Sequence, residues 1–208
     1  MNNQNKRERL IDSAATLFHH NGMNITSLAD IAKHADIPIG NVYYYFKTKE
    51  ELALAAVAKR KEQFTAAYKL LDEGFDDPRQ RLTEALGYFD KVREEYSKYG
   101  CPVGRIIEDA RVEKDVVAKT AAQIFIDFVD WAERQFKKLG HTDMARSYAI
   151  SLMSGIQGAT VMAKALSSPQ VISDEIKRLG TWIETLPNRR IQIGKVPVAV
   201  SSNSSNAA

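Results

Sequence analysis

Residues 26–52 read TSLADIAKHADIPIGNVYYYFKTKEEL, and the local signals in this stretch decide the fold. Ser27 and Asp30 have the spacing of a capping box, in which each side chain binds the other residue's amide at a helix start. The apolar residues that follow fall on one helical face: Leu28, Ile31, Ala32 and Ala35. Asp36 tolerates the left-handed backbone of a tight turn, and Pro38 suits the first position of a second helix.

The second helix is short. It has room for about two turns before Thr48, which is a good N-cap for a third helix that begins with Glu50 and Glu51. Two short helices joined by a tight turn are typical of the helix-turn-helix unit, whose second helix enters the major groove of DNA. The stretch therefore predicts a DNA reader.

An aromatic run from Tyr43 to Phe46 wraps around this second helix, so its members divide between core and surface. The spacing favours Val42, Tyr45 and Phe46 as core residues. Tyr43 and Tyr44 then point at a partner, and an exposed phenol donates readily to a phosphate oxygen.

Residues 6–57 resemble the DNA-binding domain of the TetR family of transcriptional repressors. The resemblance rests on three segments: Arg9–Gly22, Thr26–Ala32 and Gly40–Leu52. It is specific because it combines composition, spacing and a place near the N-terminus. Two positions depart from the family pattern, with Asp36 where glycine is usual and Tyr44 where histidine often stands.

The resemblance implies a homodimeric repressor that binds a palindromic operator and releases it on binding, or reacting with, a small molecule. The expected DNA-binding residues are Thr26, Ser27, Pro38, Ile39, Gly40, Asn41, Tyr43, Tyr44, Lys47 and Lys49. Among them, we expect Asn41 near the bases and Lys49 at a phosphate. The alternative function is an all-α protein-binding adaptor that keeps a helix-turn-helix-like N-terminus.

The composition permits DNA binding without establishing it. The 208 residues hold 29 Lys and Arg against 26 Asp and Glu, a formal net charge of +3. A single cysteine excludes an internal disulfide, which suits a reducing cytoplasm. We see no signal-peptide pattern and no apolar run of the roughly 18–20 residues that span a bilayer. We therefore expect a cytoplasmic protein without a membrane partner.

The rest of the chain has helical periodicity. A first helix from Lys6 to Asn21 ends at Gly22, and further helices are predicted over 50–72, 79–98, 103–112, 115–138, 142–167 and 171–186. We predict an all-α protein. Its parts are a three-helix DNA-binding domain over 1–48, a helical effector-binding and dimerisation domain over 49–186, and a disordered tail over 187–208.

The middle helices are rich in aromatic residues. Most of these residues form core, yet small-molecule pockets also form between the helices of such a bundle. The resemblance implies an effector pocket in this second domain. The candidate lining residues are Phe89, Val92, Tyr96, Cys101, Ile107, Phe125, Phe128 and Trp131.

The predicted helix over 142–167 carries small residues along one face. Gly155 and Gly158 each cost about 1 kcal/mol relative to alanine inside a helix, which favours a packing role. One interpretation is a core helix of a single subunit. The favoured one, which the resemblance also implies, is a four-helix dimer interface formed with Ser154, Gly155, Gly158, Met162, Trp182 and Ile183.

Catalytic and metal-binding patterns are not visible. We find no Ser/His/Asp order, paired carboxylates or glycine-rich phosphate loop, so we expect neither an enzyme nor a cofactor. His19 and His20 are adjacent on a helix, so their side chains should diverge by about 100° and not share a metal ion. His34 and His141 are isolated in the sequence.

Cys101 lies just before a helix that starts near Pro102. At that position the helix dipole lowers the pKa of a thiol, so one interpretation is a reactive sensor whose modification releases DNA. The favoured interpretation is a small buried apolar residue, as most lone cysteines are.

Overall fold

The computed structural model describes residues 3–109 and 116–187, and in those ranges the secondary structure is helical, without β-strands. This confirms the predicted all-α class. The helices are α1 Asn3–His20, α2 Leu28–His34, α3 Ile39–Tyr45, α4 Lys49–Gly74, α5 Pro78–Lys91, α6 Arg93–Tyr99, α7 Pro102–Asp109, α8 Val116–Lys138, α9 Ala145–Ala165 and α10 Gln170–Thr185. The tail predicted to be disordered lies, from residue 188 onward, outside the described residues.

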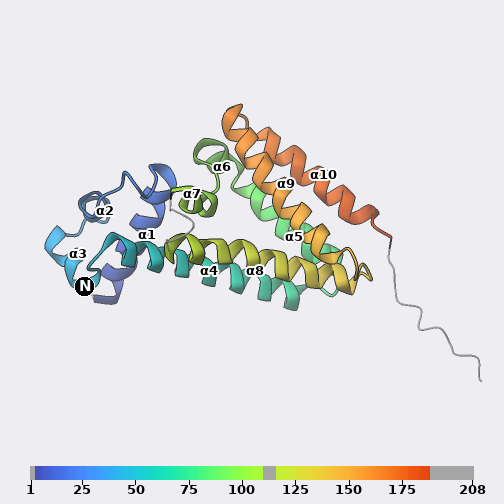
Figure 1. The fold of residues 1–208 in the computed structure, drawn as a ribbon, viewed down its shortest axis with the longest axis horizontal. Coiled ribbons are helices and arrows are strands. Elements are labelled where there is room, and N and C mark those ends of the chain that lie inside the picture. Colours follow the sequence, from blue (N-terminus) through green and yellow to red (C-terminus); the bar gives the residue numbers. More distant parts are fainter. Residues whose placement is uncertain (1–2, 110–115, 188–208) are drawn as a thin grey trace, which may run out of the picture.

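Helices α1, α2 and α3 gather at one end of the molecule (Figure 1). Ser27 caps α2 and forms the predicted capping box with Asp30. Asp36 adopts a left-handed φ of 50° in the turn before α3. Thr48 caps α4 by accepting a hydrogen bond from the amide of Glu51 at 3.1 Å. The predicted helix-turn-helix is therefore present, with the caps that its sequence indicates.

Two basic residues of α1 hold this unit in place. The guanidinium of Arg9 donates to the carbonyl of Ala35 at 2.5 Å, at the turn between α2 and α3. The guanidinium of Arg7 lies 5.3 Å from the centroid of the Phe46 ring, a cation–π distance. The start of α1 thus contacts both the turn before α3 and the residue that ends α3.

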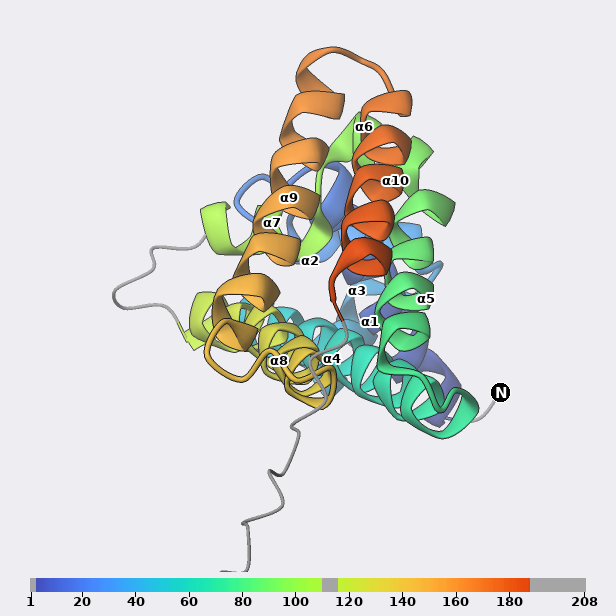
Figure 2. The ribbon, with the colours of Figure 1, turned by 90° about the vertical axis from the view of Figure 1, so that its right-hand side faces the viewer.

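Helix α4 connects the two halves of the molecule. Its first turns bury Leu52, Ala53, Ala56 and Val57, and the helix packs against both α1 and α8. Figures 1 and 2 show α4 and α8 running side by side along one edge of the larger half. Helix α4 therefore links α1, on which α2 packs, to α8 of the larger half.

The helix predicted over 79–98 is interrupted. Helix α5 ends at Lys91, Val92 leaves the helical conformation, and α6 begins at Arg93. Neither proline nor glycine marks this break. Asp90 is held from two sides, because Ser173 of α10 donates to its carboxylate at 2.5 Å and Arg93 donates to its carbonyl at 3.1 Å. One contact distant in sequence, from Ser173, thus accompanies the bend.

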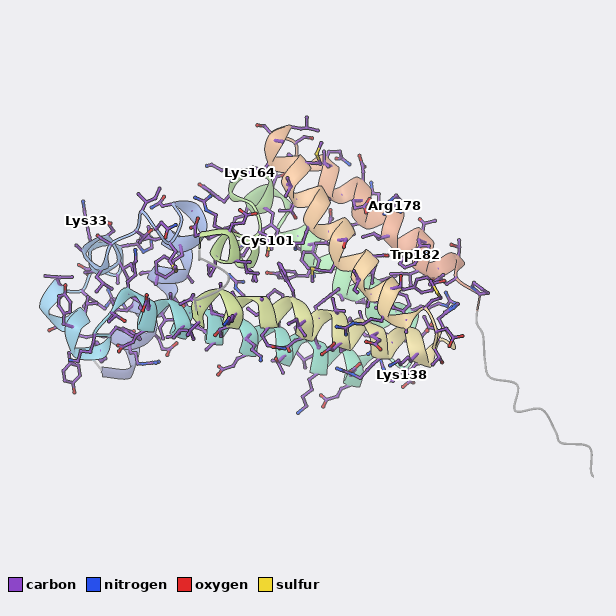
Figure 3. The ribbon with its side chains drawn as sticks, viewed as in Figure 1. Lys33, Cys101, Lys138, Lys164, Arg178 and Trp182 are labelled. Carbon is purple, nitrogen blue, oxygen red and sulfur yellow. The ribbon has the colours of Figure 1, made fainter. Side chains whose placement is uncertain are left out.

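Helices α9 and α10 form a pair on the outer side of the larger half (Figure 2). Trp182 of α10 packs between Phe136 of α8 and Tyr148 of α9, with ring centroids 5.7 and 5.2 Å apart (Figure 3). A Cβ atom at Gly155 would lie 3.3 Å from the Leu179 side chain. Gly155 therefore permits the close approach of α9 and α10 within one chain.

A buried polar cluster joins α4, α5 and α8. Arg81 donates to the carbonyls of Phe75 and Asp72 at 2.7 and 2.9 Å, and to the side-chain amide of Gln135 at 3.2 Å. Gln135 donates in turn to the carboxylate of Asp72 at 3.1 Å. The guanidinium satisfies carbonyls at the C-terminal end of α4, which fixes that end of the helix.

Candidate DNA interface and effector cavity

The outer face of α3 is exposed and aromatic. Ile39, Tyr43 and Tyr44 are 43%, 50% and 71% exposed, whereas Val42 and Phe46 are buried. The i, i+4 spacing places Ile39 beside Tyr43 and Gly40 beside Tyr44 on this face. A Cβ atom at Gly40 would meet no heavy atom within 4 Å, so the helix surface is open there.

Three further predicted DNA contacts precede α2 or α3, namely Thr26, Ser27 and Pro38, and the first two form hydrogen bonds within the chain. Thr26 is buried, and its hydroxyl donates to the carbonyl of Gly22 at 2.8 Å. The hydroxyl of Ser27 donates to the Asp30 carboxylate at 2.6 Å, and these hydrogen bonds lower the pKa of Asp30. Pro38 is exposed and stands just before α3 rather than at its first position. Of these residues, Thr26 is buried inside the domain.

The two predicted lysines differ in their surroundings. Lys47 is exposed, and its ammonium donates to the carbonyl of Tyr43 at the end of α3. Lys49 is partly buried, and its ammonium donates to the carbonyl of Met23 at 2.8 Å. Lys49 thus anchors the loop between α1 and α2, a contact that sequence spacing does not reveal.

The same loop is held from the other side by α7. The amide of Met23 donates to the carboxylate of Asp109 at 2.7 Å, and Arg105 donates to the carbonyl of Asn21 at 2.9 Å. Gly22, with φ of 98°, allows this approach, because a Cβ atom there would lie 2.8 Å from both Arg105 and Asp109. We name residues 21–24 the junction loop.

An apolar cavity of about 410 Å³ lies between α4, α5 and α8. This volume falls within the range of small-molecule sites. The lining residues are Arg60, Gln63, Phe64, Ala67, Tyr68, Leu70, Leu71 and Phe75 from α4 and the turn after it, Glu84, Ala85, Tyr88 and Phe89 from α5, and Phe128 from α8. Burial raises the pKa of Tyr68, so its phenol is neutral.

The predicted pocket residues divide into several groups. Phe89 and Phe128 line the 410 Å³ cavity, and they also line a narrow inner void with Tyr96, Cys101 and Phe125. Trp131 instead borders a separate polar groove beside α4. Val92 and Ile107 belong to neither the cavity nor the inner void. Sequence reasoning missed the α4 wall, because the pattern of α4 indicated only a connecting helix.

Cys101 lies immediately before α7, as predicted, but its surroundings do not activate it (Figure 3). The residue is 9% exposed, and burial raises the pKa of its thiol despite hydrogen bonds from the amides of Gly104 and Val103. The lowered pKa expected from the helix dipole is therefore wrong, since removing the sulfur from water outweighs the dipole.

The outer face of α9 is exposed and uncharged. Residues along it repeat at helical spacing: Ser147, Ser151, Ser154, Gly158, Met162 and Ala165. Of the predicted interface residues, Ser154, Gly158 and Met162 lie on this face. Gly155 and Ile183 do not, because Gly155 faces α10 and Ile183 is fully buried within the chain. Trp182 is half-buried between helices of the same chain.

His19 and His20 do not diverge as predicted. Their ligand atoms and a carboxylate oxygen of Glu95 all lie within 4.8 Å of one another. The prediction was wrong because it considered only the angle between the two residues around the helix axis and not the rotation of their side chains. At the end of α1, His19 turns its Nδ1 atom toward Glu95, and His20 turns its Nε2 atom toward the same carboxylate.

None of the helices in the described ranges is both long enough and apolar enough to span a bilayer.

Comparison with known proteins identifies relatives of both halves. Residues 10–56 match the model for bacterial regulatory proteins of the tetR family. An HTH-type transcriptional regulator of Mycobacterium tuberculosis H37Rv is 29% identical over 173 residues, covering 77% of this chain and 85% of that protein. The HTH-type transcriptional repressor NemR of Escherichia coli K12 is 28% identical over 99 residues, covering 45% of this chain and 46% of that protein.

The fold also matches solved structures. A TetR-family regulator from Agrobacterium tumefaciens superposes with a TM-score of 0.77 at 20% sequence identity. The match covers 87% of this chain and 98% of that chain. It extends the likeness through the larger helical half, where it concerns the fold alone.

The burial of Cys101 predicts slow thiol chemistry. N-ethylmaleimide at pH 8 should label the native protein at least about tenfold more slowly than the chain unfolded in guanidinium, because the folded thiol is neutral and covered. Mass spectrometry over time measures both rates, with Cys101→Ser as the unlabelled control. Equal rates in the folded and unfolded chains would contradict the burial and restore the sensor interpretation.

Proposed function

The chain belongs to the TetR family of bacterial regulatory proteins, and on that premise we propose that it is a homodimeric repressor released from a palindromic operator by a small apolar molecule. The observation that carries the proposal is the double use of α4. This helix walls the cavity with Phe64, Tyr68 and Leu71, and its first residue, Lys49, holds the junction loop. A molecule in the cavity therefore acts on the helix that positions the DNA reader.

DNA reading falls to α3. Asn41 and Gly40 occupy its first turn, where side chains of a recognition helix meet base edges. Tyr43 and Tyr44 are exposed further along and suit phosphate contacts, which set the register on the duplex. We assign Lys49 to the junction loop and not to a phosphate, because its ammonium is already bound to a backbone carbonyl.

A palindromic operator requires two readers related by a two-fold axis. The readers of such dimers reach half-sites about one helical turn of DNA apart, roughly 34–36 Å. The uncharged face of α9 suits the subunit contact, because small residues such as Ser154 and Gly158 permit close helix approach without burying charge. Met162, 50% exposed, adds apolar area to the same face.

The chemistry of the cavity indicates the class of effector. Its walls are aromatic and aliphatic, so the bulk of the ligand is apolar, and the flat rings of Phe64, Tyr88 and Phe89 suit an aromatic body. Arg60 and Glu84 are the charged residues among its lining. Arg60 suits a carboxylate, sulfonate or phenolate on the ligand.

Release follows from two-state coupling. An effector lowers DNA affinity only as far as it binds the non-DNA conformation better than the DNA-bound one. The junction loop is bonded both to α4 through Lys49 and to α7 through Asp109. When α4 shifts around a ligand, these bonds carry the shift to the loop that precedes the helix-turn-helix.

For DNA reading, we predict different effects from two variants. Tyr44→Phe removes one hydroxyl and should weaken the operator and an unrelated duplex alike, by about tenfold or more for a hydrogen bond to a charged phosphate. Asn41→Ala should weaken only the operator, by about 1–3 kcal/mol at one base-pair position. Fluorescence anisotropy at fixed salt measures both, on an operator selected from random duplexes, with Tyr148→Phe as the remote control. The assignment fails if Tyr44→Phe alters sequence preference.

For the cavity, Ala67→Trp should fill the effector site without disturbing the core, because Ala67 is exposed on α4 and faces the cavity. Anilinonaphthalene sulfonate, an aromatic anion, serves as the probe. We expect saturable fluorescence with the parent protein and with Ala66→Trp, the neighbouring exposed control, and at least a tenfold weaker response with Ala67→Trp. Equal probe binding by all three proteins would place the effector site elsewhere.

For assembly, Gly158→Leu should convert the dimer to monomer at micromolar concentrations. A Cβ atom at Gly158 meets no heavy atom within 4 Å in the chain, so the subunit accepts the change. Overpacking at a close contact costs about 1–3 kcal/mol, and the two-fold axis repeats that cost in both subunits. Sedimentation velocity measures the outcome, with Gly87→Leu on α5 as the control. A dimeric Gly158→Leu protein would exclude this face as the interface.

A further inference from the structure

Three potential metal ligands from α1 and α6 meet beside the junction loop. The Oε1 atom of Glu95 lies 3.3 Å from Nδ1 of His19 and 3.3 Å from Nε2 of His20. His19 is buried, while the side chains of His20 and Glu95 are 31% and 49% exposed. The cluster thus has one fixed inner ligand and two outer ligands in reach of solvent.

The hydrogen bonding of His19 leaves one ring nitrogen without a proton and facing a carboxylate. Its Nε2 lies 2.7 Å from the carbonyl of Gly100, which only accepts hydrogen bonds. That contact places the ring proton on Nε2 and leaves Nδ1 as an acceptor facing the carboxylate of Glu95. Two acceptors at 3.3 Å repel each other unless a cation lies between them.

A metal ion binds imidazole through a ring nitrogen that carries no proton, and Nδ1 of His19 is the nitrogen left free by the contact with Gly100. The backbone carbonyl at Nε2 is the outer partner that metal-bound histidines commonly have.

The spacing fits a small tetrahedral ion. Zinc bonds of about 2.0–2.1 Å at tetrahedral angles separate neighbouring ligand atoms by about 3.3–3.4 Å. Both distances from Glu95 have this value, and the ligand atoms of His19 and His20 lie within 4.8 Å of each other. Two imidazole nitrogens and one carboxylate oxygen suit zinc, and the exposed side leaves a fourth position for water.

We propose that His19, His20 and Glu95 form a binding site for Zn²⁺ that joins α1 of the DNA-binding half to α6 of the regulatory half. Aromatic stacking orients the outer ligand, because the His20 ring lies on Tyr99 with centroids 3.9 Å apart. An ion bound here braces the same boundary that the junction loop crosses. The site is separate from the effector cavity, whose lining includes none of the three ligands.

Cobalt titration tests the site directly. The untagged full-length protein, stripped with EDTA and dialysed, is titrated with Co²⁺, whose visible absorption is far stronger in four-coordinate than in six-coordinate sites. We expect one Co²⁺ per chain, displaced by Zn²⁺, and a Zn²⁺-dependent rise in the melting temperature. Glu95→Gln and His20→Asn should each weaken binding at least tenfold.

Controls separate the site from general effects. His34→Asn removes an exposed histidine of α2 outside the cluster and should bind Co²⁺ like the parent. Melting in EDTA shows whether each variant folds, and anisotropy in EDTA shows whether it retains DNA binding. The proposal is overturned if folded Glu95→Gln binds as tightly as the parent, if His34→Asn loses binding equally, or if neither metal binds the parent at 100 µM.

Discussion

The backbone of Met23 joins the two halves of this protein. Its amide donates to Asp109 of α7, and its carbonyl accepts from Lys49 at the start of α4. Both bonds involve a charged side chain, so each is stronger than an ordinary peptide hydrogen bond. The adjacent Gly22 has no side chain that would separate the helices. These bonds add to the packing of α1 against α4 and α7, and together they set the position of the helix-turn-helix relative to the larger half.

The parts that sequence predicted well are those decided by neighbours along the chain. The capping box at Ser27, the left-handed turn at Asp36 and the cap at Thr48 each involve groups within four residues. The division of the aromatic run into buried Phe46 and exposed Tyr44 follows from helical periodicity alone. Most helix ends fall where glycine, proline or a capping residue marks them.

The parts that sequence missed depend on distant segments. The α4 wall of the cavity, the bond from Lys49 to Met23 and the meeting of His20 with Glu95 join residues far apart along the chain. Periodicity reveals that a face is apolar without revealing which helix covers it. The predicted lowering of the Cys101 pKa was wrong for the same reason. The helix dipole is a local effect, whereas the burial that raises the pKa comes from helices packed around the sulfur.

Helix α4 serves both as a wall of the cavity and as the support of the DNA reader, and this has a thermodynamic consequence. Under the proposed function, coupling between two sites through one element is reciprocal. Bound operator must then lower the protein's affinity for the effector by the same factor by which bound effector lowers its affinity for the operator. A repressor seated on its operator is therefore a poorer receptor than one free in solution, and the concentration of effector that clears the operator exceeds the dissociation constant of the free protein.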